Sequence, residues 1–360
     1  MTQRARVIGC GGYLPSQIVT NDMLSETLDT SNEWIVKRTG ILQRHIAADG
    51  QLTSDLAVAA AQEAIKKAGI QPTEIDAIIL ATTTPDDTFP ATALTVQRKL
   101  GADRAFAFDM QAVCAGFIYA LATADSFIKS GQAKTVLVIG AEVMSRILDW
   151  QDRKTCILFG DGAGALILQA QDTTDDKAAR GILSTHLYAD GCHRDLLYVD
   201  GGAGRGGAVG VVRMEGREIF RHAVEKLGAA VVDSLKANNL TADDIQWFVP
   251  HQANLRIIES MSERFCIAPE KVILSVAEHA NTSAASIPLA FAVADGADKF
   301  RPGDLIMSVA FGGGLTWGSA LLRWYRGYFG NYGNCDKKVF SGRILGVLSV
   351  VKSISTYSAS

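Results

Sequence analysis

The feature that most constrains the fold of this 360-residue chain is an internal repeat. Four blocks come into register at one constant offset: 67–75 with 237–245, 78–80 with 248–250, 115–122 with 285–292, and 129–139 with 299–309. The offset of 170 residues is visible in the step from Ala115 to Ala285. A constant offset over about 75 residues indicates two copies of one structural unit. Recurrent α/β units of similar length are the alternative explanation.

Helical patterns alternate with short apolar strands in both copies, which is typical of α/β proteins. We expect helices at 54–68, 114–129, 219–237 and 283–294, and strands at 75–81, 136–139, 247–250 and 305–309. The near-continuous apolar strands indicate a sheet that helices cover on both faces. We therefore predict an α/β half at 1–171, a second at 178–324 and a pseudo-twofold axis that places the site between them. The polar segment 172–177 would connect the halves.

Composition narrows the class of protein. The net charge of −3 gives no reason to expect nucleic-acid binding, and no apolar run approaches the roughly 20 residues that span a bilayer. The N-terminus does not read as a secretory signal. The six cysteines are scattered without a Cys-x-x-Cys pair. This pattern predicts a cytoplasmic protein with neither a disulfide framework nor a metal site.

Three separate segments contain side chains suited to catalysis. Cys114 lies among small and apolar residues where a helix is expected to start, and two such segments follow far downstream, at 251–254 and 281–286. A thiolate at a helix N-terminus is stabilised by the peptide dipoles and free N–H groups, and it attacks thioesters at neutral pH. A buried structural cysteine is the alternative. A thiol, the imidazole of His251 and the carboxamide of Asn281 are together the parts of an acyl-transfer site.

The settings of the downstream residues favour the same chemistry. His251 follows an apolar strand directly, and the ends of strands in α/β sheets are where sites gather. Asn281 is a neutral donor; a turn or N-cap role before the next helix is a common alternative for asparagine, and one residue can fill both roles. The run from Phe311 to Gly314 contains three glycines, which allow a tight turn and a close approach of backbone to a ligand. A plain connecting turn is the alternative there.

The chain from about Val7 to Trp324 resembles the β-ketoacyl-acyl-carrier-protein synthase III family. The matching motifs are Asp29-Thr30-Ser31-Asn32-Glu33-Trp34-Ile35, Arg38-Thr39-Gly40-Ile41, Cys114-Ala115-Gly116-Phe117, Phe159-Gly160-Asp161-Gly162-Ala163-Gly164, Pro250-His251-Gln252-Ala253-Asn254, Asn281-Thr282-Ser283-Ala284-Ala285-Ser286 and Phe311-Gly312-Gly313-Gly314-Leu315-Thr316-Trp317-Gly318. The resemblance implies a thiolase-like α/β fold in five layers, αβαβα. It also implies a homodimer that condenses an acyl-CoA primer with malonyl-acyl-carrier protein through an acyl-cysteine and keeps no bound cofactor.

The resemblance further implies a role for individual residues. The catalytic residues would be Cys114, His251 and Asn281, and the N–H groups of Cys114 and Gly313 would form the oxyanion hole. Coenzyme A would contact Trp34, Arg38, Arg153 and Asn254. Acyl-carrier protein, which is acidic, would contact Gln252 and Arg256, with Lys226 or Arg217 as further candidates. Phe311 would line the acyl pocket, and Phe89 would reach across the dimer into the pocket of the partner.

Other functions share parts of this pattern. Degradative thiolases carry a second cysteine in the glycine-rich turn, and the elongating synthases carry a second histidine where this chain has Asn281. Plant-type polyketide synthases share the Cys-His-Asn set, but their glycine motif differs. An acyl-transfer relative that makes quinolones or esters, a cysteine hydrolase and a non-catalytic carrier-protein binding subunit remain alternatives. Steady release of free acid from acyl-CoA would identify the hydrolase.

Two features depart from the family pattern. Ala280 stands where the family usually has glycine, so the loop before Asn281 is expected to differ in fine geometry. Residues 325–360 resemble nothing in the family and carry five basic residues against the single acid Asp336. We predict that this tail is a non-native extension. A partner-binding appendage is the alternative.

Overall fold

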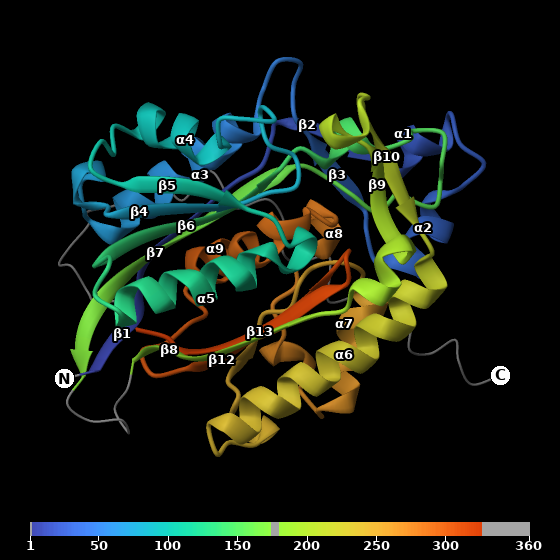
Figure 1. The fold of residues 1–360 in the computed structure, drawn as a ribbon. Coiled ribbons are helices and arrows are strands. Elements are labelled where there is room, and N and C mark those ends of the chain that lie inside the picture. Colours follow the sequence, from blue (N-terminus) through green and yellow to red (C-terminus); the bar gives the residue numbers. More distant parts are fainter. Residues whose placement is uncertain (1, 174–179, 326–360) are drawn as a thin grey trace. The chain divides into compact units, whose positions relative to one another are not determined.

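The computed structural model describes residues 2–173 and 180–325 (Figure 1). Most of the polar connection predicted at 172–177, and the predicted tail beyond Tyr325, lie outside the described residues. From residue 2 to 173 the chain forms β1 (Thr2–Tyr13), β2 (Gln17–Thr20), α1 (Asn21–Ser25), α2 (Asn32–Thr39), β3 (Gln43–Ile46), α3 (Thr53–Ala68), β4 (Ala77–Ala81), α4 (Thr92–Leu100), β5 (Phe106–Met110), α5 (Gly116–Lys129), β6 (Thr135–Glu142) and β7 (Gly162–Thr173).

From residue 180 to 325 it forms β8 (Gly181–Ala189), β9 (Leu197–Gly201), β10 (Val209–Met214), α6 (Gly216–Ala237), β11 (Trp247–Phe248), α7 (Leu255–Arg264), α8 (Val276–His279), α9 (Ser286–Gly296), β12 (Leu305–Gly312) and β13 (Thr316–Arg323). Short 3₁₀ turns precede α5 and α9, at Val113–Ala115 and Ser283–Ala285.

Two sheets of the same design form the framework. The first has the strand order β1-β7-β6-β4-β5, and the second has the order β8-β13-β12-β11. In the first sheet β7 pairs antiparallel with β1 and β6, and β4 pairs parallel with β6 and β5. In the second sheet β13 pairs antiparallel with β8 and β12, and β12 pairs parallel with β11. An isolated parallel bridge from Phe248 to Val272 stands where the second sheet would have its equivalent of β5.

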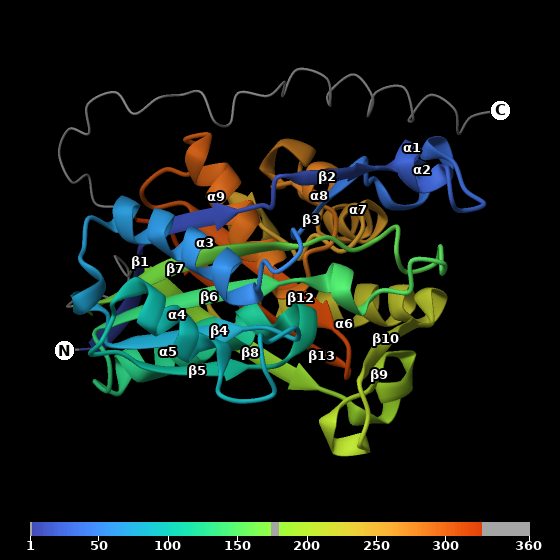
Figure 2. The same cartoon turned by 90° about the horizontal axis from the view of Figure 1, so that it is seen from above.

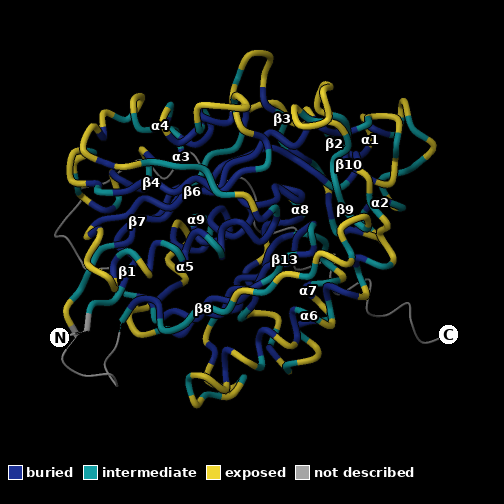
Figure 3. Tube along the Cα trace, viewed as in Figure 1, coloured by how far each residue is buried: buried dark blue, intermediate teal, exposed yellow. Residues whose placement is uncertain are grey.

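Helices separate and cover these sheets, which gives the five layers that the resemblance implied. Helices α5 and α9 lie between the two sheets, α3 and α4 cover the outer face of the first sheet, and α6 and α7 cover the second (Figures 1 and 2). Every residue of β4, β6 and β12 is buried, as expected for strands with helices on both faces (Figure 3).

Small residues bring α3 directly onto β1. A Cβ at Gly9 would lie 2.3 Å from the Ala64 carbonyl oxygen, and a Cβ at Gly11 would lie 2.3 Å from that of Ala60. The helix presents a fully buried alanine face to these glycines. The alanine spacing in the sequence therefore places helix backbone against strand backbone, a closer approach than larger side chains permit.

The sequence repeat corresponds to a repeat of backbone structure. β6 and β12 begin and end at equivalent residues, Thr135 with Leu305 and Glu142 with Gly312. The two 3₁₀ turns are also equivalent, and both begin with a non-glycine residue at positive φ, since Val113 and Ser283 each have φ of 49°. The division into halves at 171 and 178 stays a prediction, because residue contacts group Met1–Arg326 into one compact unit.

Several element boundaries differ from the predicted ones. The helix predicted at 114–129 begins with the 3₁₀ turn, and β6 extends to Glu142 where the prediction stopped at Ile139. β11 contains only Trp247 and Phe248, although extended chain continues to His251. No helix within residues 2–173 and 180–325 is long and apolar enough to cross a membrane.

Candidate active site

Residues of all three candidate catalytic segments line one cavity of about 450 Å³. Its lining includes Cys114, His251 and Asn281, which come from the start of α5, the end of the β11 segment and the loop before α9. All three side chains are nearly inaccessible, with exposures of 5%, 5% and 6%. The cavity therefore draws residues from both copies of the sequence repeat.

Backbone geometry positions Cys114 against the glycine-rich turn. The thiol residue is the middle residue of the 3₁₀ turn before α5. A Cβ at Gly312 would lie 2.8 Å from the Cys114 backbone nitrogen, so only glycine lets β12 approach this turn. The Thr316 hydroxyl donates a hydrogen bond of 2.8 Å to the Ala112 carbonyl and fastens the end of the glycine turn to the nucleophile turn.

Burial dominates the electrostatic surroundings of the Cys114 thiol. Burial raises its pKa to about 12, the Ser283 hydroxyl opposes this rise, and the Glu142 carboxyl adds to it. Burial of a charge is unfavourable, so the surroundings of Cys114 favour the neutral thiol over the thiolate. The thiolate expected at this helix start stays a prediction.

His251 is held at the end of an extended segment. Its backbone N–H donates a hydrogen bond of 2.8 Å to the Val309 carbonyl of β12, which continues the parallel pairing of β11. Nδ1 lies 2.6 Å from the Ser286 Oγ. Burial lowers the pKa of His251 to about 3, so the imidazole is neutral at physiological pH. A neutral imidazole carries one N–H and one acceptor nitrogen.

Asn281 is oriented by its own turn. Its Oδ1 accepts a hydrogen bond of 2.9 Å from the Ser283 N–H, and this leaves the amide NH₂ group for the cavity. The backbone is fixed on both sides, because the Asn281 N–H donates to the Leu158 carbonyl and its carbonyl accepts from the Gly160 N–H. The turn role that was an alternative for this asparagine is thus compatible with a donor role in the site.

Cationic residues surround the half-buried Trp34 at another part of the cavity. The guanidinium carbons of Arg38 and Arg153 lie 4.3 and 5.2 Å from the centroid of the Trp34 ring. Arg153 also pairs with Asp29 at 3.1 Å. The cations that line the cavity are Arg38, Arg153, Lys154, Arg217 and Arg256. A cavity with such a lining suits a ligand that carries phosphate groups.

Comparison with known proteins places the chain in a family. A curated relative from Paramagnetospirillum magneticum, a β-ketoacyl-[acyl-carrier-protein] synthase III, is 59% identical over 323 residues, which are 90% of this chain and 100% of the relative. One from Bradyrhizobium diazoefficiens with the same name is 58% identical and covers 89% of this chain and 99% of its own length. The chain belongs to the β-ketoacyl-[acyl-carrier-protein] synthase III family.

The family profiles and a solved structure agree with this membership. Profiles described as 3-oxoacyl-[acyl-carrier-protein (ACP)] synthase III and as its C terminal match residues 108–191 and 235–324. The crystal structure of 3-oxoacyl-[acyl-carrier-protein] synthase III from Aquifex aeolicus superposes with a TM-score of 0.83 at 46% identity, covering 89% of this chain and 100% of that one. The thiolase-like α/β fold inferred from the motifs is thereby confirmed.

Most residues that the synthase III resemblance named are found at this cavity. Trp34, Arg38, Arg153, Asn254, Arg256 and Phe311 line it together with the catalytic set. Asn254 also caps α7, since its Oδ1 accepts from the Arg256 N–H at 2.9 Å while its Nδ2 donates to the Arg38 carbonyl at 3.2 Å. Gly313 is not itself a lining residue, although a Cβ there would lie 2.7 Å from the carbonyl oxygen of Leu197, which lines the cavity. The part of Gly313 in an oxyanion hole stays a prediction.

The assignment of Gln252 to carrier-protein binding is contradicted by its burial. The side chain is 0% exposed. Its Nε2 donates to the Pro250 and Ile273 carbonyls, and its Oε1 accepts from the Ser275 and Val276 N–H groups. All the polar capacity of this amide is used inside the protein, so Gln252 joins two loops and does not face a partner. Spacing in the sequence gave no sign of this, because Gln252 directly follows a residue of the site.

Three further predicted contacts need comment. Phe89 is 83% exposed and does not line the cavity of its own chain. Lys226, a candidate for carrier-protein contact, pairs with Asp190 at 3.3 Å and lies 4.4 Å from the Trp317 ring centroid, so its charge is already engaged. Arg217 lines the cavity and remains a candidate.

Ala280 occupies a backbone conformation that glycine favours. Its φ is 57° and its ψ is −161°, and its side chain is fully buried. This region of backbone space costs an L-residue on the order of 1–3 kcal/mol. The departure from the family pattern is therefore accommodated as local backbone strain beside Asn281, without loss of the amide orientation described above.

Some residues of the site were not identified from the sequence as contributors. Ser283 and Ser286 lie within a recognised motif, but no role was assigned to either hydroxyl. Glu142, at the end of β6, accepts hydrogen bonds from Thr82, Thr83 and Thr84 and bears on the pKa of the thiol. Within residues 2–173 and 180–325, no group of three His, Cys, Asp or Glu side chains could hold a metal ion.

Proposed function

We propose that this chain catalyses the decarboxylating condensation of an acyl-CoA, acetyl-CoA first among them, with malonyl-acyl-carrier protein. The products are a 3-oxoacyl-acyl-carrier protein, CoA and CO₂, and the reaction initiates fatty-acid synthesis. The observation that supports it most is the single cavity that Cys114, His251 and Asn281 share with a cationic lining. The known relatives at 59% and 58% identity carry the name of this activity.

The first half-reaction loads the primer. The Cys114 sulfur attacks the carbonyl carbon of the acyl-CoA thioester, and the bond from that carbon to the CoA sulfur breaks. Because the buried thiol is neutral, its proton passes to the departing CoA sulfur, and CoA leaves as a thiol. The negative charge that develops on the carbonyl oxygen needs donors, and the Cys114 and Gly313 N–H groups are the proposed pair.

The second half-reaction forms the carbon–carbon bond. The malonyl group loses CO₂, and the bonding electrons move into the thioester as an enolate. The N–H of His251 and the NH₂ of Asn281 donate to the enolate oxygen, which stabilises the charge as it develops. The enolate carbon then attacks the acyl group on Cys114, and the Cys114 thiolate leaves and takes up a proton. A neutral imidazole suits this role because it donates without being charged.

The lining cations and Trp34 suit the carrier groups of both substrates. The Trp34 ring offers a face for adenine, and Arg38 and Arg153 already lie over that ring, where they can also meet phosphates. Arg256, whose guanidinium carbon lies 5.5 Å from the Phe220 ring centroid, is the proposed contact for the acidic carrier protein, with Arg217 beside it in the lining.

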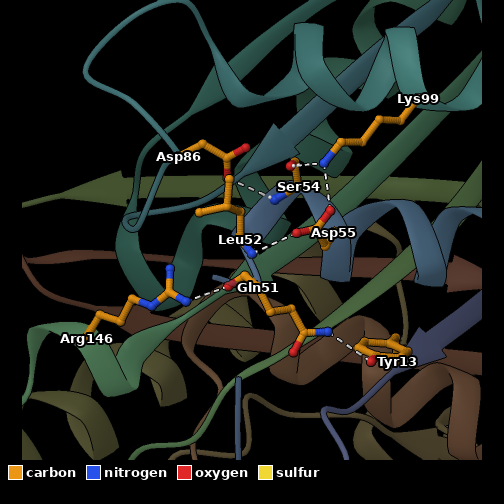
Figure 4. A network of polar contacts seen from close by, with 8 residues as sticks. All are labelled: Tyr13, Gln51, Leu52, Ser54, Asp55, Asp86, Lys99 and Arg146. Carbon is orange, nitrogen blue, oxygen red and sulfur yellow. Dashed lines mark hydrogen bonds and ion pairs between the residues drawn. The ribbon is translucent and has the colours of Figure 1, made fainter. Parts of the chain in front are cut away.

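We further propose a homodimer in which Phe89 enters the acyl pocket of the partner. The loop that carries Phe89 is closed at its base, where the Asp86 N–H donates a hydrogen bond of 2.9 Å to Thr92 Oγ1, although its tip is exposed. Asp86 accepts a hydrogen bond of 3.0 Å from the Ser54 N–H, within a network that includes Asp55 and Lys99 (Figure 4). Before it, Thr82 to Thr84 bond to the buried Glu142.

A large aromatic side chain that a rigid loop presents to solvent is typical of an interface. The edge strand β5, with Phe106 38% exposed, offers a second unpaired surface on the same sheet. Sedimentation equilibrium tests the dimer, and a monomer at micromolar concentration contradicts it.

Mass spectrometry of the intact protein tests the acyl-cysteine. Mixing the enzyme with a panel of acyl-CoA thioesters should add the mass of one acyl group, and the preferred thioester identifies the primer. Cys114→Ser should abolish this addition, because an alcohol at neutral pH is a far weaker nucleophile. Cys156→Ser is the matched control, since Cys156 is also buried but does not line the cavity. Acylation that persists in Cys114→Ser refutes the proposed nucleophile.

Two alternatives left open by the sequence, one about the tail and one about hydrolysis, have direct tests. A protein truncated after Tyr325 should keep its condensation activity if residues 325–360 are a non-native extension. A large loss of activity in the truncated protein favours the partner-binding appendage. Free acid released steadily from acyl-CoA, in the absence of malonyl-acyl-carrier protein, would identify a hydrolase in place of a synthase.

A further inference from the structure

The imidazole of His251 has a polar partner that the proposed mechanism does not use. Ser286 Oγ lies 2.6 Å from His251 Nδ1, and Ser286 is only 2% exposed. This serine is the first residue of α9, at the position that Gly116 occupies in the other copy of the repeat. The distance is that of a short hydrogen bond between buried groups, so one of the two atoms must donate to the other.

The second contact of this hydroxyl decides which atom donates. The Gln252 backbone N–H donates to Ser286 Oγ at 3.3 Å. Among residues 2–173 and 180–325, His251 and Gln252 are the polar partners found for this oxygen. If Nδ1 carried the proton, the oxygen would accept twice and its own O–H would be buried without an acceptor. Buried donors without a partner are unfavourable. The Ser286 hydroxyl therefore donates its proton to the hydrogen bond, and His251 Nδ1 accepts it.

Gln252 makes this arrangement stable. Its buried side chain forms four hydrogen bonds, two to the carbonyls of Pro250 and Ile273 and two from the N–H groups of Ser275 and Val276. These bonds fix the backbone on either side of His251, so the Gln252 N–H is held toward Ser286. The burial that excludes Gln252 from carrier-protein binding thus gives it a structural role beside the imidazole.

We propose that Ser286 is a positioning residue that fixes His251 in the tautomer with its proton on Nε2. With Nδ1 engaged as an acceptor, Nε2–H is a donor, and the imidazole has no free nitrogen to receive the Cys114 proton. Loading of Cys114 is therefore independent of His251, whereas stabilisation of the enolate depends on it. The tautomer follows from the contacts alone, and only its use in catalysis rests on the proposed function.

Nitrogen NMR of the protein with ¹⁵N-labelled histidine tests the tautomer directly near neutral pH. Long-range ¹⁵N–¹H couplings distinguish the two tautomers of a neutral imidazole, and the His251 signals are assigned by their loss in His251→Gln. We expect Nε2 to carry the proton in the wild type and in Ser286→Thr, which keeps the hydroxyl. Ser286→Ala should shift the population toward Nδ1–H. A wild-type spectrum with the proton on Nδ1 overturns the proposal, whether or not either variant folds.

Kinetics separate a positioning role from a packing role. In Ser286→Ala, CO₂ release from malonyl-acyl-carrier protein should fall about 10- to 100-fold, the range for loss of a residue that orients a metal-bound imidazole. Acyl loading and KM should change little, and Ser286→Thr should restore the rate. Ser319→Ala is the matched control, because Ser319 is a buried serine whose hydroxyl donates to the Ala230 carbonyl away from the imidazole.

The outcomes distinguish this proposal from the proposed function. Equal losses in Ser286→Ala and Ser319→Ala, or a Ser286→Ala enzyme with wild-type tautomer and rate, overturn the positioning role while leaving the synthase intact. A protein with the expected tautomer that neither loads acyl groups nor releases CO₂ instead refutes the synthase and supports the hydrogen-bond assignment alone.

Discussion

Replacing either buried histidine should make the stability of this protein less sensitive to acid. His251 and His279 are nearly inaccessible, and burial lowers their pKa values to about 3 and about 4, with nearby His45 contributing at His279. In the unfolded chain both regain the ordinary value near 6.5. At a pH between the folded-state and unfolded-state pKa values of a histidine, the unfolded state binds more protons than the folded state. The free energy of unfolding therefore falls as the pH falls.

The size of the effect follows from these values. At pH 5 both folded-state pKa values lie below the solution pH, so both histidines stay neutral in the folded protein. The decrease in the free energy of unfolding therefore comes chiefly from their protonation in the unfolded chain. Each histidine then lowers the free energy of unfolding by about 2 kcal/mol relative to neutral pH, and the two together by about 4 kcal/mol. Domains are typically stable by only about 5–15 kcal/mol, so the loss should be large enough to measure.

Urea unfolding between pH 7.5 and pH 5 measures this difference. Buried carboxylates act in the opposite direction, because burial raises the pKa values of Asp161 and Glu142, and comparison of each variant with the wild type removes their contribution. His251→Gln or His279→Gln should each reduce the loss by about 2 kcal/mol. The control Ile118→Val should lower stability equally at every pH. A histidine variant with the wild-type pH dependence refutes the reasoning.

Three other perturbations have defined outcomes. His251→Ala or Asn281→Ala should reduce CO₂ release from malonyl-acyl-carrier protein about 10²–10³-fold while acyl loading changes less, and equal damage to both half-reactions counts against the assigned roles. Gly140→Ala should lower the free energy of unfolding by about 3 kcal/mol, since its Cβ would lie 2.2 Å from the Ala284 carbonyl oxygen; an unchanged urea midpoint contradicts this packing. Arg256→Ala should raise KM for the carrier protein several-fold and weaken its dependence on salt, and unchanged values exclude the contact.

The sequence was sufficient to predict the fold wherever a residue pattern has one physical solution. Short, fully apolar runs such as β4 are typical of strands covered on both faces, and the recurrence of alanines at Ala115 and Ala285 marked two equivalent helix starts. Boundaries were less certain, because the 3₁₀ turns at Val113 and Ser283 depend on tertiary contacts that hold a non-glycine residue at positive φ.

The motifs named residues that lie together, but they did not indicate the electrostatics of the site. Cys114, His251 and Asn281 line one cavity in the structure, and their catalytic roles stay predictions. Their protonation was not predictable from sequence, because burial depends on everything that surrounds a group. The same limitation explains Gln252, which adjoins His251 in sequence yet faces the interior. The Ser286 contact joins residues 35 positions apart, and no spacing rule indicates it.

The glycine contacts at the centre of the fold have a consequence for how substrates arrive. Gly140 contacts the Ala284 backbone, and a Cβ at Gly164 would lie only 2.5 Å from the Leu289 nitrogen, too close to be accommodated. Strands of the first sheet therefore touch the segment that leads into α9, and α9 itself, without side chains between them. We therefore expect a cavity that keeps its shape during turnover, so that a ligand reaches the Cys114 sulfur by passing along the cavity and slender ligands enter more readily than broad ones.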